Sequence, residues 1–223
     1  MADHPAWRHP TRPESRRILL VVQVAVIAAQ SWIAHSLHVH PFWLLPAITA
    51  VLLAASMTVY ERLDEPSRQA RVLSLAVSAL LVLTNAVNLA LLVYHVFVQS
   101  SLSSVDLLLS GVALWIVNLG VFALVYWELD GGGPESRAAG YPDRFPDLVF
   151  PQQQGDQPDL ARDDWKPSFH DYLYVSLTDS FAFSPTDTMP YTGTAKLVMG
   201  VESIMSFAIA AVLVARAVNI ATG

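Results

Sequence analysis

The sequence predicts an all-α integral membrane protein with about five transmembrane helices and a re-entrant pore-helix loop before the last of them. The 223 residues are 53% hydrophobic and 14% charged, with a mean hydropathy of +0.42, whereas soluble domains carry about 25% charge. The apolar residues are gathered into runs long enough to cross a hydrocarbon core of about 30 Å. This composition argues against a soluble globular enzyme.

Five runs have the length and composition of membrane spans. They cover residues 18–34, 41–60, 72–98, 105–129 and 197–220, and the first four contain no Lys or Arg. The first run ends without a convincing small-x-small cleavage site, and a second run follows almost at once. We therefore interpret it as a membrane helix and not as a cleaved signal peptide.

The chain divides into four regions. Residues 1–17 form a basic N-terminal tail, 18–129 a four-helix transmembrane region, 130–168 a loop rich in Pro, Gly and acidic residues, and 169–223 a half-helix with the last transmembrane helix. The loop contains six prolines and eight acidic residues against four basic ones, so it cannot lie in lipid. We expect most of it to be irregular and solvated, with short apolar patches such as 148–151 packing on the membrane domain.

The distribution of positive charge predicts the orientation in a cell membrane. Seven arginines lie in the N-terminal tail and around the loop after the second span, whereas the loops after the first and third spans have no Lys or Arg: Arg8, Arg12, Arg16, Arg17, Arg62, Arg68 and Arg71. This bias predicts a cytoplasmic N-terminus. With five spans, the C-terminus is expected outside and the 130–196 region inside.

The region from residue 169 to 220 carries the most functional information. Residues 171–181 form an apolar, aromatic-rich stretch too short to span a bilayer, and a polar, proline-containing stretch at 184–190 separates it from a full-length helix. A half-helix, an irregular turn and a spanning helix are typical of a re-entrant loop, in which non-helical backbone lines a cavity or is buried in protein. An amphipathic helix lying on the membrane surface is the alternative interpretation.

The stretch from Leu173 to Leu197 resembles the pore loop of the potassium-channel superfamily, and it aligns with a two-transmembrane channel pore without a gap. The matching residues are those of the pore-helix start, the aspartate, proline and threonine after the filter, and the entry into the inner helix: Leu173, Tyr174, Val175, Ser176, Asp187, Pro190, Thr192, Lys196 and Leu197. Residues 215–220 also resemble the end of an inner helix. The likeness covers about the last quarter of the chain.

The departures from that family lie at the ion filter. The resemblance places the filter at Ala182, Phe183, Ser184, Pro185 and Thr186, so both filter glycines are lost. Glycine permits the φ values that direct successive carbonyls at the ion axis, whereas proline holds φ near −65°. We therefore expect no carbonyl cage selective for potassium. Ser206 also replaces the glycine often found as an inner-helix hinge.

Nearly the whole chain resembles an uncharacterised bacterial membrane-protein family with a channel-like C-terminal region. The shared features are the WELDGGGP exit at 127–134, a DLVFP patch at 147–151, DYLY at 171–174 and AVN at the end. This family brings no established activity.

The pore resemblance implies an ion-channel-like protein, a weakly selective cation pore formed by oligomerisation, in which each chain supplies one loop of a homotetramer. Asp187 would supply a ring of carboxylates at its mouth, and the transported species would be a monovalent cation. The alternative is a non-conducting membrane protein that keeps the pore-domain fold as an assembly or sensor module.

Polar residues inside the predicted membrane segments are expensive in hydrocarbon and are candidates for function. Glu202 could face a central cavity, or it could snorkel or pair with Lys196 or Arg216 of a neighbour. Asp179 could face a vestibule or satisfy backbone donors of the following turn. Three asparagines are expected to form hydrogen bonds between helices: Asn85, Asn88 and Asn118.

Other classes of function find little support. The absence of cysteine excludes disulfides and Cys-ligated metals. His35, His38 and His40 could bind a transition metal, although no carboxylate lies beside them and a solvated turn is the simpler interpretation. No G-x-S-x-G or HExxH motif indicates an enzyme, no cofactor is indicated, and a net charge of −6 without a basic stripe excludes nucleic acid as a partner.

Overall fold

A computed structural model describes residues 10–11, 16–62, 68–98, 102–141, 145–154 and 165–222. Arg8 and Arg12, which contributed to the predicted orientation, lie outside these ranges. The described chain is almost entirely helical. Its elements are α1 (Arg16–Ser36), α2 (Leu44–Arg62), α3 (Arg68–Phe97), α4 (Ser104–Leu129), η2 (Asp130–Gly132), α5 (Pro134–Ala138), β1 (Leu148–Val149), η3 (Pro151–Gln153), α6 (Phe169–Ala182), β2 (Met189–Pro190) and α7 (Gly193–Thr222).

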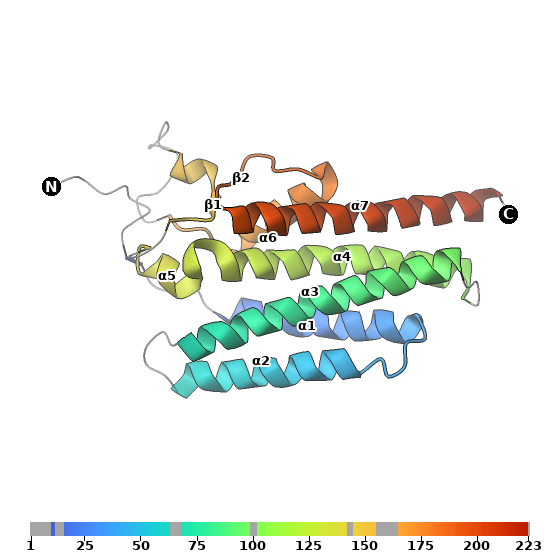
Figure 1. The fold of residues 1–223 in the computed structure, drawn as a ribbon, viewed down its shortest axis with the longest axis horizontal. Helices are drawn as coiled ribbons and strands as arrows, with labels where there is room; N and C mark the ends of the chain where they lie inside the picture. The colour runs from blue at the N-terminus through green and yellow to red at the C-terminus, as the bar shows by residue number, and fades with distance from the viewer. Residues whose placement is uncertain are drawn as a thin grey trace.

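Four of the described helices, α1, α3, α4 and α7, are long and apolar enough to cross a membrane. The protein is thus an all-α chain with several membrane-spanning candidates, as the sequence predicts. The second predicted span is helix α2, whose described apolar stretch is Leu44–Val59 and which lies beside α3 at the edge of the bundle (Figure 1). A fifth crossing therefore stays a prediction.

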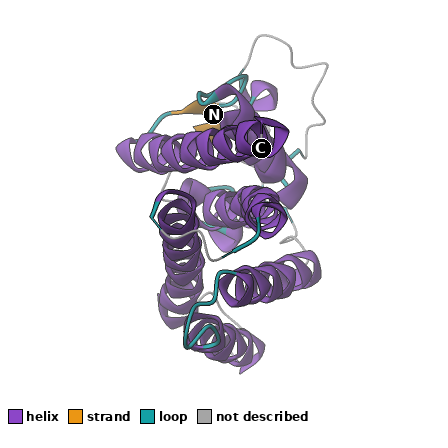
Figure 2. Cartoon of the chain, turned by 90° about the vertical axis from the view of Figure 1, so that its right-hand side faces the viewer, coloured by secondary structure: helices purple, strands orange, loops and turns teal. Residues whose placement is uncertain are grey.

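The long helices run side by side, with α4 in the middle of the bundle (Figures 1 and 2). It packs against α1, α3, α6 and α7, and every residue from 121 to 128 is buried. A helix that is apolar on all sides can be covered in this way by neighbours on every face. Ser103 caps the start of the helix, and its hydroxyl accepts the Asp106 N–H at 3.1 Å.

The glycine-rich exit of α4 turns the chain sharply. Gly131, Gly132 and Gly133 all have positive φ, a backbone region that glycine enters without steric cost. A side chain at Gly133 would lie 2.0 Å from the Arg71 guanidinium, and one at Gly131 would lie 2.2 Å from the Tyr141 ring. The glycines therefore allow both the turn and the close approach of these two side chains.

The 130–168 region is less irregular and less solvated than expected where it is described. It contains two 3₁₀ turns, a short helix and strand β1, which pairs antiparallel with β2. Leu148 and Phe150 are buried, and the Phe150 ring contacts Trp165 and Tyr172 edge-on. The predicted packing of the 148–151 patch is confirmed in these two residues, whereas 155–164 lies outside the described residues.

Helix α6 and the segment after it form a hairpin against α4 and α7. The start of α6 lies beside Asp130, which accepts a hydrogen bond from the Tyr172 hydroxyl. The end of α6 lies beside Trp115, whose ring centroid is 4.7 Å from that of Phe181. Fifteen residues of α4 separate these two levels, a rise of about 22 Å. The chain then returns through residues 183–188 to β2, so it enters and leaves at one end of the bundle (Figure 1).

Candidate functional site

Helix α6 buries polar side chains beside apolar ones, Phe169, Tyr172 and Val175, and exposes large apolar side chains on its other face. Its buried face includes Ser176, Asp179 and Ser180, whereas the exposed face is made of large apolar and aromatic residues: Leu173, Tyr174, Leu177 and Phe181. A helix lying on a water-exposed surface would show the opposite arrangement. The buried polar groups of the second half of α6 lie against α4 and α7.

Glu202 on α7 lies at the centre of these polar groups and is 0% exposed. One carboxylate oxygen accepts hydrogen bonds from the hydroxyls of Ser176 and Ser180, the latter at 3.1 Å, and the other accepts one from Tyr126. These four residues, the Glu202 cluster, come from α4, α6 and α7. Because the carboxyl group has three hydroxyl donors, its burial in an apolar bundle is compensated by hydrogen bonding.

The cluster continues as a chain of hydrogen bonds toward α3. Ser180 and Ser206 lie 2.9 Å apart, Asn118 donates to Ser206 at 3.0 Å, and Asn85 donates to Asn118 at 2.7 Å. Since the Ser180 proton is directed at Glu202, Ser206 is the donor to Ser180. The chain therefore runs in one direction, from α3 through α4 to the carboxyl group on α7.

The predicted interhelical role of the three asparagines is confirmed. Asn85 and Asn118 join α3, α4 and α7, and Asn88 donates to the Gln30 carbonyl of α1 at 3.3 Å. All three side chains are buried. Their amide groups donate across helix interfaces, while the buried Asn85 Oδ1 has no hydrogen-bond partner among the described residues.

Asp179 occupies a neighbouring position within the same protomer. The Ser203 hydroxyl lies 3.1 Å from both Asp179 carboxylate oxygens, and the aspartate is buried. Asp179 and Glu202 thus lie behind the α6 hairpin, between the helices, and the described ion pairs of the chain include neither. Arg216 donates to the Ser104 hydroxyl of the same chain at 2.9 Å.

The filter-like segment, residues 182–187, lies on the opposite side of the hairpin. All six residues are exposed. Phe183 adopts a left-handed backbone with φ of 52° and closes α6 by donating its N–H to the Asp179 carbonyl, while its ring contacts Phe207 edge-on. The only side-chain partners described for Asp187 are the hydroxyls of Thr186 and Thr188, so its carboxylate is available at the surface.

The three groups of residues selected from the sequence therefore lie apart. The filter-like segment is on the surface, whereas Asp179 and Glu202 are inside the protomer. The exposed His35, His38 and His40 lie at the far end of α1. Among the described residues no group of three or more His, Cys, Asp or Glu side chains could hold a metal ion.

A second cluster, not selected from the sequence as a site, lies where α4 ends. We call Asp130, Arg137, Asp147 and Tyr172 the boundary cluster. Asp130 accepts the N–H groups of Asp147 and Leu148 at 2.7 and 3.0 Å and the Tyr172 hydroxyl at 2.6 Å. Arg137 donates to the carbonyls of Trp127 and Asp130, each at 2.8 Å. The stretches 127–134, 147–151 and 171–174 each contribute one of these residues.

Burial also shifts two ionisable groups beside this cluster. It raises the pKa of the Tyr141 phenol above its ordinary value. Burial, reinforced by the charge of Arg137, lowers the pKa of Lys166 to about 8, and the ammonium lies 5.2 Å from the centre of the Tyr141 ring. Desolvation disfavours the charged form in both cases.

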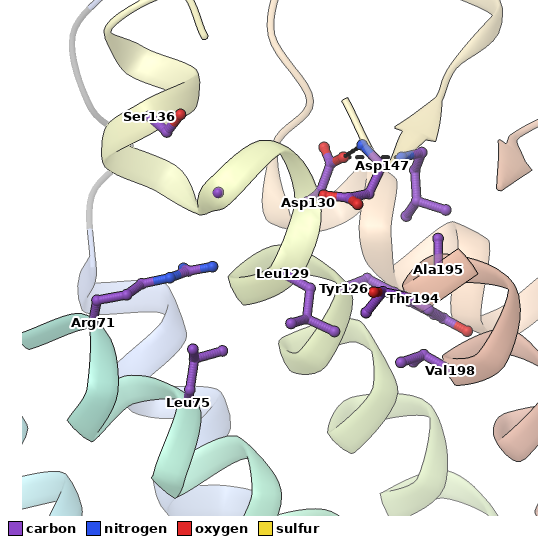
Figure 3. A pocket seen from close by; sticks show the side chains of 12 residues that line it. Arg71, Leu75, Tyr126, Leu129, Asp130, Ser136, Asp147, Thr194, Ala195 and Val198 are labelled. Carbon is purple, nitrogen blue, oxygen red and sulfur yellow. Dashed lines mark hydrogen bonds between the residues drawn. The ribbon is translucent and has the colours of Figure 1, made fainter. Parts of the chain in front are cut away.

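A cavity of about 410 Å³ opens beside the boundary cluster (Figure 3). Arg71 lies on one wall, and Asp130 and Asp147 lie on the other. Its remaining lining is mostly apolar: Leu75, Tyr126, Leu129, Leu148, Ala195 and Val198, with Gly132, Ser136 and Thr194. The volume falls within the range of small-molecule sites.

Comparison of the chain with family models, with curated proteins and with solved structures finds no significant match.

Proposed function

We propose that the protein is a channel-like membrane protein whose α6–α7 hairpins assemble, in a homo-oligomer, around a weakly selective cation pathway. The hairpin carries the proposal: a 14-residue helix descends beside α4, and a non-helical return leads to the long apolar helix α7. In this assignment α6 is the pore helix, residues 182–187 line the pathway and α7 is the inner helix. The number of subunits expected is four, by resemblance to potassium-channel pores.

The distribution of exposed residues supports this assignment. The non-helical return presents residues 182–187 outward from the protomer, where a neighbouring chain or a water-filled path would meet them. An apolar stripe follows along α7: Leu197, Val201, Ile204, Phe207, Val214 and Val218. Non-helical backbone at membrane depth requires protein or water beside it, and oligomerisation supplies both.

The polar groups behind the hairpin have a supporting role in this proposal. The Glu202 cluster ties α6 to α4 and α7, and Asp179 with Ser203 adds a second connection between α6 and α7. A filter-like segment attached to a firmly held helix keeps its geometry while ions pass. Glu202 and Asp179 thus position the pore helix, and Asp187 is the carboxylate that meets the cation.

The second candidate is a non-conducting membrane protein that uses the same fold for assembly or sensing. One observation favours it: among the described residues, the buried hydroxyl and carboxyl groups of the Glu202 cluster are satisfied within one protomer. Pro185 and the left-handed Phe183 also differ from a repeating carbonyl ladder. This candidate predicts the same oligomer without ion flux.

Ion flux into proteoliposomes containing the purified chain distinguishes the two candidates. We expect cation flux with little discrimination between sodium and potassium, because side chains replace the carbonyl cage. Strong potassium selectivity would contradict the assignment of residues 182–187, and absence of flux from an oligomeric preparation would favour the non-conducting candidate. A monomer in lipid would exclude the pore, because one hairpin cannot enclose a path.

A charge-neutralising variant tests the pathway itself. Asp187→Asn should lower cation conductance, most clearly at about 0.01 M salt, where the screening length is about 30 Å. Asp106→Asn is the matched control, because Asp106 is an exposed acid near the opposite end of α4. Equal conductance of Asp187→Asn and the unmodified protein at low salt would remove Asp187 from the pathway.

A further inference from the structure

The cavity beside the boundary cluster is built from three helices with the same two-level pattern. Each helix places a polar residue at the rim and an apolar or aromatic one a single turn deeper: Arg71 and Leu75 on α3, Asp130 and Tyr126 at the end of α4, Thr194 and Val198 on α7. Residues four apart lie on one face of a helix. The cavity thus has a polar rim and an apolar interior.

The rim coincides with the ends of three membrane-spanning candidates. The candidate spans of α3 and α7 begin at Arg68 and Gly193, and that of α4 ends at Gly132. The polar level of the cavity therefore lies where hydrocarbon gives way to headgroups, and the apolar level lies one helical turn, about 5 Å, further in. A ligand that matches both levels is an amphiphile.

The charges at the rim specify the headgroup. The Arg71 guanidinium lies 3.3 Å from Glu128 and projects from one wall, while Asp130 has the Arg137 guanidinium close to its backbone. Asp147 forms no ion pair among the described residues; its carboxylate accepts the Thr192 hydroxyl at 2.6 Å and the Gly131 N–H at 2.8 Å. These two bonds leave about two acceptor positions unused.

We propose that this cavity binds a zwitterionic phospholipid with a primary ammonium in its headgroup. The ammonium would donate hydrogen bonds to Asp147, the phosphate would lie on the Arg71 wall across the cavity (Figure 3), and the acyl chains would follow Leu75 and Val198 toward the hydrocarbon. A choline headgroup has no N–H to donate, and a glycerol headgroup has no positive charge for the acidic wall. The site is independent of ion conduction.

Lipid titration of the full-length protein in detergent, read by native mass spectrometry, tests the proposal with dilauroyl phosphatidylethanolamine, phosphatidylcholine and phosphatidylglycerol. We expect the ethanolamine lipid to bind about tenfold more tightly than the other two, the effect of one charge-assisted hydrogen bond. Equal binding of the three lipids would overturn the proposal. Full competition by soluble phosphoethanolamine at the same concentration would overturn the lipid assignment, because the apolar level would then contribute nothing.

Variants that fill the cavity locate the binding. Val198→Phe should abolish the preference for ethanolamine lipid, whereas Val201→Phe, on the exposed face of the same helix, should keep it. Ser136→Phe fills the cavity from α5 and gives the same test if Val198→Phe does not fold. At the rim, Arg71→Gln should weaken lipid binding. Arg68→Gln is the control, because Arg68 is exposed three residues before Arg71 on the same helix, and it should leave lipid binding unchanged. A preference that survives both filling variants would overturn the site.

Discussion

Replacing Glu202 by alanine removes the acceptor shared by three buried hydroxyls, those of Tyr126, Ser176 and Ser180. Hydrogen bonds between membrane helices contribute about 0.6 kcal/mol each on average, so the three bonds amount to about 2 kcal/mol. The void left by the truncated side chain adds about 1 kcal/mol. We expect Glu202→Ala to lower the free energy of unfolding by about 3 kcal/mol.

Thermal unfolding of the purified protein in one detergent, followed by circular dichroism, measures this effect. For a chain of this size, 1 kcal/mol corresponds to about 2–4 °C in Tm, so the expected decrease is about 6–12 °C. Glu202→Gln should cost less than about 1 kcal/mol, because the amide oxygen still accepts from both serines and the amide nitrogen can donate to the Tyr126 oxygen. The difference between the two variants isolates the acceptor role from the charge.

Thr178→Ala is the matched control on α6. The Thr178 hydroxyl donates only to carbonyls of its own helix, those of Tyr174 and Val175, each at 3.0 Å, so its removal should change the Tm by no more than about 2 °C. If Glu202→Ala is as stable as this control, the Glu202 cluster does not hold α6. If Glu202→Gln is as damaging as Glu202→Ala, the charge of the carboxylate, and not its hydrogen bonding, is the stabilising feature.

Three further predictions concern the boundary region and the membrane topology. Lys166 should reach half of its maximal reactivity with acetic anhydride near pH 8. Peptide mass spectrometry measures this reactivity, with Lys196 as the internal reference. A half-maximal reactivity near pH 10.5 would contradict the effect of burial on the Lys166 pKa. Because this pKa is lower in the folded chain than in the unfolded one, the unfolded chain binds more protons between these values, and the Lys166 contribution to stability should rise as the pH increases through that window. Gly133→Ala should lower the Tm by at least about 2–4 °C, because its φ of 97° and ψ of 178° lie in a region used almost only by glycine, at a cost of about 1–3 kcal/mol for other residues, and the new methyl group displaces Arg71. Gly193→Ala, where a side chain meets open space, should not lower the Tm, and equal effects of the two variants would refute the steric argument. Reporter fusions at the two chain ends should place the N-terminus in the cytoplasm and the C-terminus outside, and two cytoplasmic ends would show that one of the five spans is miscounted.

The long helices could be predicted closely because their signal is local. Residues 105–129 were expected to span and form nearly all of α4, and the stretch 171–181 lies within α6. The beginning of α6 has its own local signal, since the Asp171 carboxylate accepts the Ser168 N–H at 2.7 Å.

The boundary cluster shows what the composition of a segment cannot predict. Residues 130–168 are polar and proline-rich, and a solvated loop was therefore expected. Yet Asp130 is buried, because its carboxylate accepts donors that lie 17, 18 and 42 residues away in the chain. Only the fold brings these donors to one point, so the burial of Asp130 was not visible in its local sequence.

The sequence by itself determined that this chain belongs in a membrane and where its long helices lie, because the transfer of each apolar side chain into hydrocarbon depends on that side chain alone. It also identified Glu202 and Asp179 as expensive residues in an apolar environment. Only the tertiary structure decided how that cost is met. The hydroxyls that surround Glu202 come from α4 and α6, and their meeting with α7 depends on helix packing, which couples residues far apart in the chain and leaves no pattern within any one helix.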